Sequence, residues 1–231
     1  MTDVGRNPGN LRFEQETMFK GVSFQGARVL DIGSSDGGVT DLYAAAAGAA
    51  RVVGLSPEGD GSFEGATATF EQLRDQLDLE QVVVLRDSIQ EYEPAGEQFD
   101  LLISRASINH VDENACIRLR QDADARERYL KVFQKLAALT APGGAFVIKD
   151  AMPSNFFGAL RMRNPMMPTL EWHKHQPPKV WVELLSQAGF VAPSVRWVTL
   201  NTLRGPGQLL FGNRLGSYFT LSTFVLTMRR A

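Results

Sequence analysis

A glycine-rich turn after the first apolar run of the chain is the segment best suited to hold a ligand. Residues 29–38 read VLDIGSSDGG, so an acidic side chain precedes the glycines. Glycine lacks a Cβ atom, which lets the backbone approach a ligand closely and adopt positive φ angles. The glycine spacing matches neither the dinucleotide-binding fingerprint nor the phosphate-binding loop. The turn therefore predicts a ligand site of another kind, beyond the carboxyl end of a strand.

The densest cluster of polar residues is EWHKHQ, at residues 171–176, immediately before a pair of prolines. In an extended segment Glu171, His173 and His175 would project from one face, because side chains two residues apart share a face of a strand. That spacing would suit a metal ion, but similar neighbours occur in many polar loops. We expect no metal here and favour recognition of a substrate, with binding by Glu171, Trp172 and Lys174.

The three histidines of the chain are candidates for proton transfer. A histidine titrates near neutral pH, so its side chain can remove a proton from a hydroxyl or an amine. His173 and His175 belong to the polar cluster. His110 follows a predicted strand, at the sheet edge where ligands bind. For His110, a role in stabilising its own loop is the alternative.

Charge is distributed unevenly along the chain. Residues 1–150 carry a net charge of −9 and residues 151–231 carry +7, although the whole chain carries only −2. Such asymmetry is typical of a protein with an anionic ligand or partner, or of solvated arginines on one face. Both interpretations stay open. For an anionic substrate, the pairing residues would be Arg161, Arg163 and Lys174.

Short apolar runs alternate with amphipathic helices through the first two thirds of the chain. Runs rich in Val, Ile, Leu or Phe predict strands at 28–32, 51–55, 82–85, 99–104 and 145–149. Apolar side chains recur at helical spacing from Ala66 to Leu77 and from Tyr129 to Leu139. Apolar strands joined by helices predict right-handed crossovers and a parallel sheet that is covered on both faces. The expected fold is a doubly wound α/β domain.

The pattern changes after the fifth predicted strand. Residues 151–178 combine methionines, phenylalanines and prolines, which we interpret as a substrate lid; ordinary core packing of the methionines is the alternative. One more helix should end at Gly189. Strands at 195–202 and 217–229 would then form an antiparallel hairpin at the sheet edge.

The glycine-rich turn resembles motif I of the class I S-adenosylmethionine-dependent methyltransferases, in which an acid and an apolar residue precede G-x-G-x-G. Asp31, Gly33 and Gly37 match this pattern, and Ser35 stands at the middle glycine. The similarity continues in register along the chain. The further segments that resemble the family are RDS at 86–88, QFDLLIS at 98–104, INHV at 108–111, APGG at 141–144 and AGF at 188–190.

This resemblance implies a Rossmann-like, mostly parallel seven-stranded sheet, S-adenosylmethionine as cofactor, and methyl transfer to an oxygen or nitrogen of a small polar or anionic acceptor. It also implies cofactor contacts for Asp31, Gly33, Ser35, Gly37, Ser56, Asp87 and Ser88. One family feature is absent, because Ser56 stands where an acid usually binds both ribose hydroxyls. Either Glu58 takes that role or the ribose is held more weakly.

Two other functions stay open. A catalytically silent cofactor-binding or scaffolding module would account for the serines at positions 35 and 56. A nucleic-acid methyltransferase is favoured by the basic last third of the chain. It is disfavoured because the sequence has no separate binding domain and no Asn-Pro-Pro-aromatic tetrad after the fourth predicted strand.

Composition limits the class of protein further. With 231 residues, 44% of them hydrophobic and 22% charged, the chain is typical of one soluble domain, with a flexible tail over residues 1–10. The single cysteine, Cys116, excludes an intramolecular disulfide. No run approaches the roughly 20 apolar residues of a spanning helix. We expect a reduced cytoplasmic protein with no membrane partner.

Overall fold

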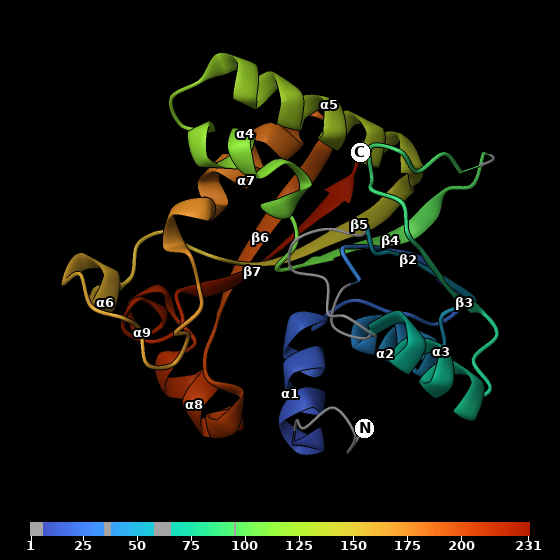
Figure 1. The fold of residues 1–231 in the computed structure, drawn as a ribbon, viewed down its shortest axis with the longest axis horizontal. Helices are drawn as coiled ribbons and strands as arrows, with labels where there is room; N and C mark the ends of the chain where they lie inside the picture. Colours follow the sequence, from blue (N-terminus) through green and yellow to red (C-terminus); the bar gives the residue numbers. More distant parts are fainter. Residues whose placement is uncertain (1–6, 35–37, 58–65, 95) are drawn as a thin grey trace.

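One mixed sheet organises the molecule in the computed structural model, which describes residues 7–34, 38–57, 66–94 and 96–231 (Figure 1). Its strand order is β3-β2-β1-β4-β5-β7-β6. The strands are β1 Arg28–Ile32, β2 Arg51–Leu55, β3 Val82–Leu85, β4 Phe99–Arg105, β5 Thr140–Ala151, β6 Phe190–Val198 and β7 Thr223–Arg230. Strands β1 to β5 run parallel, and β7 pairs antiparallel with both β5 and β6. The expected doubly wound α/β architecture is confirmed.

Helices cover both faces of the sheet, because the strands carry apolar side chains on both faces. One face packs against Met18, Leu42 and Phe70 of α1, α2 and α3, and the other packs against Tyr129 of α5 and Trp181 of α7. The helices on the two faces are α1 Pro8–Met18, α2 Val39–Ala46, α3 Ala66–Gln76, α4 Glu113–Arg118, α5 Ala123–Leu139 and α7 Pro178–Gln187. The strand order reverses between β1 and β4, which is where ligands bind in such sheets.

The sixth strand was expected at 195–202 but begins five residues earlier, at Phe190. Ala192 adopts a positive φ of 52°, and the pairing with β7 is irregular between Val191 and Ser194. This irregularity breaks the alternation of side chains, so the start of the strand is hidden in the sequence.

The seventh strand was expected at 217–229 but begins at Thr223. The preceding residues form α8 Arg204–Phe211 and α9 Arg214–Phe219 instead of a plain hairpin loop. Asn213 starts α9 by accepting a hydrogen bond from the Gly216 amide at 2.9 Å.

The structure differs from the expectation of a flexible tail over residues 1–10. Residues 8–10 of the expected tail belong to α1, whose N-terminus is capped by the Asn7 side chain. Residues 1–6 lie outside the described part.

The connection between β5 and α7 contains two short helical segments, α6 Phe156–Ala159 and η3 Trp172–Lys174. In the described ranges, no helix is both long and apolar enough to cross a bilayer.

Candidate active site

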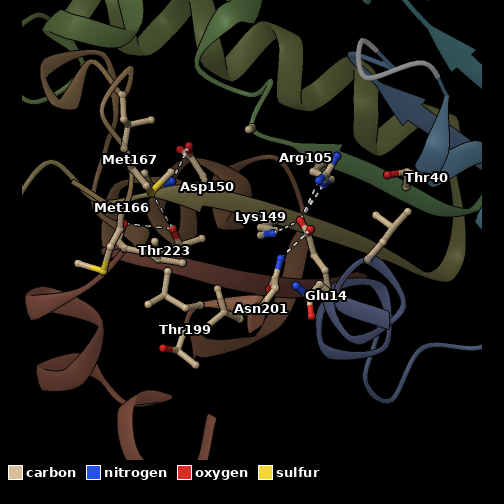
Figure 2. Close-up of a pocket in the computed structure, with 18 of the residues that line it drawn as sticks. Glu14, Thr40, Arg105, Lys149, Asp150, Met166, Met167, Thr199, Asn201 and Thr223 are labelled. Carbon is tan, nitrogen blue, oxygen red and sulfur yellow. Dashed lines mark hydrogen bonds and ion pairs between the residues drawn. The ribbon is translucent and has the colours of Figure 1, made fainter. Parts of the chain in front are cut away.

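A cavity of about 690 Å³ opens at the carboxyl ends of β1, β4 and β5. Asp31 and Gly33 line one end of it, and Met166, Met167 and His175 of the long connection line the other. Figure 2 shows polar side chains from β4, β5, α1 and the segment after β6 converging between these ends. The cavity therefore extends from the glycine-rich turn to the long connection that was expected to form a lid.

The turn after β1 is held in a shape that requires glycine. Gly33 has a φ of +85°, and a Cβ atom there would lie 2.3 Å from the Cβ of Ser107. The amides of Gly33 and Ser34 donate to the Leu55 carbonyl at 2.9 and 2.8 Å, which ties the turn to the end of β2. A side chain at position 33 would thus meet the loop after β4 before any ligand. Ser35 and Gly37 lie outside the described residues.

Two buried hydroxyl groups in the cavity wall suit a polar ligand. Thr40, in the first turn of α2, and Thr199, just after β6, are each 2% exposed. Within the described ranges neither hydroxyl oxygen has a hydrogen-bond partner. A buried hydroxyl without a partner costs free energy, so a ligand atom that reached either oxygen would supply the missing hydrogen bond.

An ionic cluster crosses the middle of the cavity. The carboxylate of Glu14 on α1 accepts hydrogen bonds from Lys149, from Arg105 at 2.8 Å and from Asn201 at 2.8 Å (Figure 2). Burial raises the pKa of Glu14, but the attraction of Lys149 and Arg105 outweighs it and lowers that pKa to about 2. Glu14 is therefore ionised at neutral pH and fixes α1 against the ends of β4 and β5.

A buried histidine and aspartate pair forms the opposite wall. The Nδ1 atom of His175 lies 2.7 Å from Oδ1 of Asp150, whose other oxygen accepts from the Trp181 indole at 3.3 Å. A carboxylate only accepts hydrogen bonds, so Nδ1 of His175 is the donor and Nε2 is the ring nitrogen left to contact a ligand. The exposed fractions of His175 and Asp150 are 5% and 1%, and both residues line the cavity. This pair has the arrangement of a general base and the carboxylate that orients it.

Sequence and fold comparisons agree with this geometry. A family model described as a methyltransferase domain matches residues 11–195, most of the chain. The chain belongs to this methyltransferase family. The comparison of this chain with curated proteins found no match.

Solved structures show the same fold at low sequence identity. A SAM-dependent methyltransferase from Aquifex aeolicus is 16% identical, with a TM-score of 0.65 over 100% of this chain and 98% of that one. An S-adenosylmethionine-dependent methyltransferase from Mesorhizobium loti is 15% identical, with a TM-score of 0.62 over 96% and 99% of the two chains. The [4+2]-cyclase SpnF is 12% identical, with a TM-score of 0.59 over 96% and 81%.

The methyltransferase domain brings some predicted cofactor residues to the cavity and leaves others outside its wall. Asp31 and Gly33 line it, whereas Ser56, Asp87 and Ser88 do not. The Ser56 amide donates to the Leu85 carbonyl at 2.8 Å, and the Ser88 hydroxyl donates to Glu91 at 2.6 Å. Asp87 is exposed. Glu58 lies outside the described residues.

The three histidines predicted to transfer protons do not come together in one site. Residues 172–174 form η3, so His173 and His175 do not share a face as they would in an extended segment. His175 is buried in the cavity wall, whereas His173 is exposed. His110 is exposed and pairs through Nδ1 with Glu113. Only His175 of the three lines the cavity.

The cations predicted to bind an anionic acceptor lie outside the cavity wall. Arg161 and Arg163 are exposed. Lys174 pairs with Glu171 at 2.7 Å and with Glu113 at 3.0 Å, so its charge is balanced at the surface. Trp172 is partly buried and also does not line the cavity.

Sequence reasoning missed most of the polar cavity wall. Glu14 lies on a helix that was expected to be partly a tail, and Asn201 follows a strand whose end was placed too late. Lys149 and Asp150 did carry a signal, because Lys149 ends a predicted strand and Asp150 follows it, at the edge of the sheet where ligands bind. The missed polar lining residues include Glu14, Thr40, Arg105, Lys149, Asp150, Thr199 and Asn201.

Proposed function

We propose that this methyltransferase domain transfers the methyl group of S-adenosylmethionine to an oxygen or nitrogen of a small polar acceptor. The observation that carries the proposal is the His175 and Asp150 pair, which shares one cavity with Asp31 and Gly33. A bound cofactor supplies a methyl group already activated on a sulfonium. The protein then has to position the acceptor, exclude water and remove a proton where the acceptor carries one. A cytoplasmic location is part of the same proposal.

The cofactor would occupy the end of the cavity next to the glycine-rich turn. Asp31, Gly33 and Thr40 line that end, and the Thr40 hydroxyl has no other partner in the described part of the chain. The family pattern adds further residues to this proposed site, which are Ser35, Gly37, Ser56, Asp87 and Ser88. Since Ser56 replaces the usual acid, the ribose would be bound with fewer hydrogen bonds than in the family pattern.

The acceptor would occupy the other end, where methionines form an adaptable apolar wall. Met166, Met167 and Leu170 line it together with the polar side chains of Thr199 and Thr223. His175 would take the proton of an acceptor hydroxyl or amine on Nε2, while Asp150 holds the ring and stabilises the charge that forms.

Any anionic group on the acceptor would meet cations other than the ones expected from the sequence. Arg105 and Lys149 are the basic residues in the cavity wall, and both already bind Glu14. Glu14, Asp31 and Asp150 offset the charge of those two cations. This balance favours a polar, uncharged acceptor over a strongly anionic one.

Transfer of a labelled methyl group tests the proposal. The full chain, S-adenosylmethionine labelled in its methyl group, and a panel of small hydroxylated compounds and amines should give a labelled product. His175→Asn should lower turnover about 10²- to 10⁴-fold, because the base is lost, and leave affinity for S-adenosylhomocysteine unchanged.

His173→Asn is the matched control, since this exposed neighbour lies outside the cavity wall. It should keep wild-type turnover. Cofactor binding without transfer to any compound of the panel would favour a silent cofactor-binding module. Full turnover in His175→Asn would contradict the assigned base.

A further inference from the structure

A surface of exposed apolar side chains covers the end of the molecule formed by α6, α8 and α9, which lie side by side in Figure 1. The ring centroids of Phe156 on α6 and Phe219 on α9 are 5.0 Å apart, so the two helices form one continuous surface. Leu209 is 85% exposed, Leu215 68% and Leu210 66%. We name this surface the apolar patch, and its members are Leu160, Met162, Leu203, Leu209, Leu210, Phe211, Leu215 and Phe219.

The helices of the apolar patch point large apolar side chains toward water and polar side chains toward the protein. In α8 the Gln208 side chain turns toward the protein and donates to the Trp197 carbonyl at 2.7 Å, while its two following leucines face outward. In α9 the fully buried residue is Ser217, and Leu215 and Phe219, four residues apart, are exposed. An amphipathic surface helix normally buries its apolar residues and exposes its polar ones. Exposed apolar surfaces of this kind mark sites of interaction.

The charged residues on the helices of the apolar patch, and immediately beside them in the sequence, are basic. Arg161, Arg163, Arg204 and Arg214 lie on or beside the same helices. None of these arginines has an ion pair with another described residue, although Arg204 donates to Asn10 at 3.3 Å. The only acids between residues 151 and 231 are Glu171 and Glu183, neither of which lies on these helices. The partner of the patch must therefore tolerate apolar side chains and supply negative charge.

In contrast to the expectation of no membrane partner, we propose that the apolar patch docks on a membrane surface that contains anionic lipids. Short helices with exposed leucine and phenylalanine and flanking arginines suit the boundary between headgroups and acyl chains. A second copy of this chain fits less well, because a twofold interface would place the arginines of the two copies against each other. Docking would be peripheral, since no helix in the described ranges could span a bilayer.

Docking in this way would place the cavity near the membrane. Asn201 and Thr202 line the cavity and belong to the segment that leads directly into α8. The membrane inference itself does not depend on methyl transfer.

Sedimentation with lipid vesicles tests this inference. The full chain should sediment with vesicles of phosphatidylcholine and phosphatidylglycerol, much less with phosphatidylcholine alone, and less at high salt. Leu209→Ser combined with Leu215→Ser should lower the partition coefficient tenfold or more, because two large apolar side chains no longer enter the interface. Arg161→Gln combined with Arg163→Gln should lower it by about fivefold for each charge removed.

Ile117→Ser combined with Arg120→Gln is the matched control, because both residues are exposed near α4, away from the patch. This variant should bind vesicles like the wild type. The inference is overturned if the wild type stays in the supernatant with anionic vesicles, or if both patch variants bind unchanged. A dimer in analytical ultracentrifugation that the leucine variant dissociates, without vesicle binding, would assign the patch to a second copy instead. The arginine variant, altered only at exposed side chains, keeps the test decisive if the leucine variant fails to fold.

Discussion

Glu14 is the residue on which the shape of the cavity depends most directly. Its carboxylate binds Lys149, Arg105 and Asn201, which come from three different segments of the sheet edge. The side chain is only 10% exposed, so water weakens these interactions little. Removing the Glu14 carboxylate would leave two largely buried cations without their shared partner, which is far more costly than losing a surface ion pair.

Glu14→Gln should therefore destabilise the chain in a pH-dependent way. The pKa of Glu14 is lowered from 4.5 to about 2, so the ionised carboxylate stabilises the fold fully above pH 4.5. That stabilisation, on the order of 3 kcal/mol, is lost as the pH falls from 4.5 toward 2. Urea unfolding at a series of pH values should show a gap between wild type and variant that is largest near neutral pH and narrows in acid.

Glu16→Gln provides the comparison, because Glu16 is on the same helix but exposed and paired only with Arg12. It should change the free energy of unfolding by less than about 1 kcal/mol. A gap for Glu14→Gln that stays constant between neutral pH and pH 3 would show that the cluster does not lower the pKa of the Glu14 carboxylate.

Individual site residues could be predicted from the sequence only where local pattern and position coincide. Asp31 and Gly33 sit in a turn whose glycine spacing is local, and His175 sits in a conspicuous polar cluster. Arg161 and Lys174 were chosen for their charge alone, and charge does not determine which way a side chain points. The Glu14 cluster joins residues up to 187 positions apart, so no local pattern could reveal it.

At the scale of elements, the connection between β5 and α7 depends on two buried asparagines. Asn155 donates to the carbonyls of Tyr218 and Thr220, both at 3.2 Å, and Asn164 donates to the Thr220 carbonyl at 2.7 Å. Each asparagine is 1% exposed. These bonds attach the methionine-containing wall to the segment between α9 and β7. The connection is therefore anchored at two points rather than loose along its length.

Asn164→Ala should release this wall without unfolding the sheet. The lost bond to Thr220 and the lost support for the Met166 amide are worth about 1 to 3 kcal/mol. Hydrogen exchange should therefore become about 5- to 100-fold faster around residues 164–170 and stay unchanged in β1 and β4. Asn114→Ala, at an exposed asparagine in α4, serves as the control. Equal acceleration throughout the chain would mean that the connection is part of the global core.

The parallel strands could be predicted because each is a short apolar run between turn residues. All five predicted runs match observed strands, although β4 is one residue longer and β5 extends at both ends. The antiparallel pair could not be placed as well, because a positive φ at Ala192 interrupts β6 and two helices fill the connection to β7. Helices α8 and α9 have apolar residues facing outward, so the usual rule for locating a helix by its buried face does not apply.

At the scale of the whole molecule, the sheet order brings together residues that are distant in sequence. Strand β4 lies between β1 and β5, so Asp31 and Asp150 end two strands of the same edge. We propose that the cofactor binds at this edge, and the cavity extends from there to His175. The proposed cofactor-binding residues can therefore be tested by cofactor affinity, and the proposed base His175 by turnover.

Calorimetric titration of the full chain with S-adenosylhomocysteine tests the central claim most directly. We predict one site per chain, and Asp31→Asn should weaken binding about 5- to 100-fold because it removes a buried carboxylate from the cavity wall. Glu16→Gln, folded and exposed, should bind like the wild type. Absence of binding to the wild type, or unchanged affinity in a folded Asp31→Asn variant, would contradict a cofactor site at the glycine-rich turn.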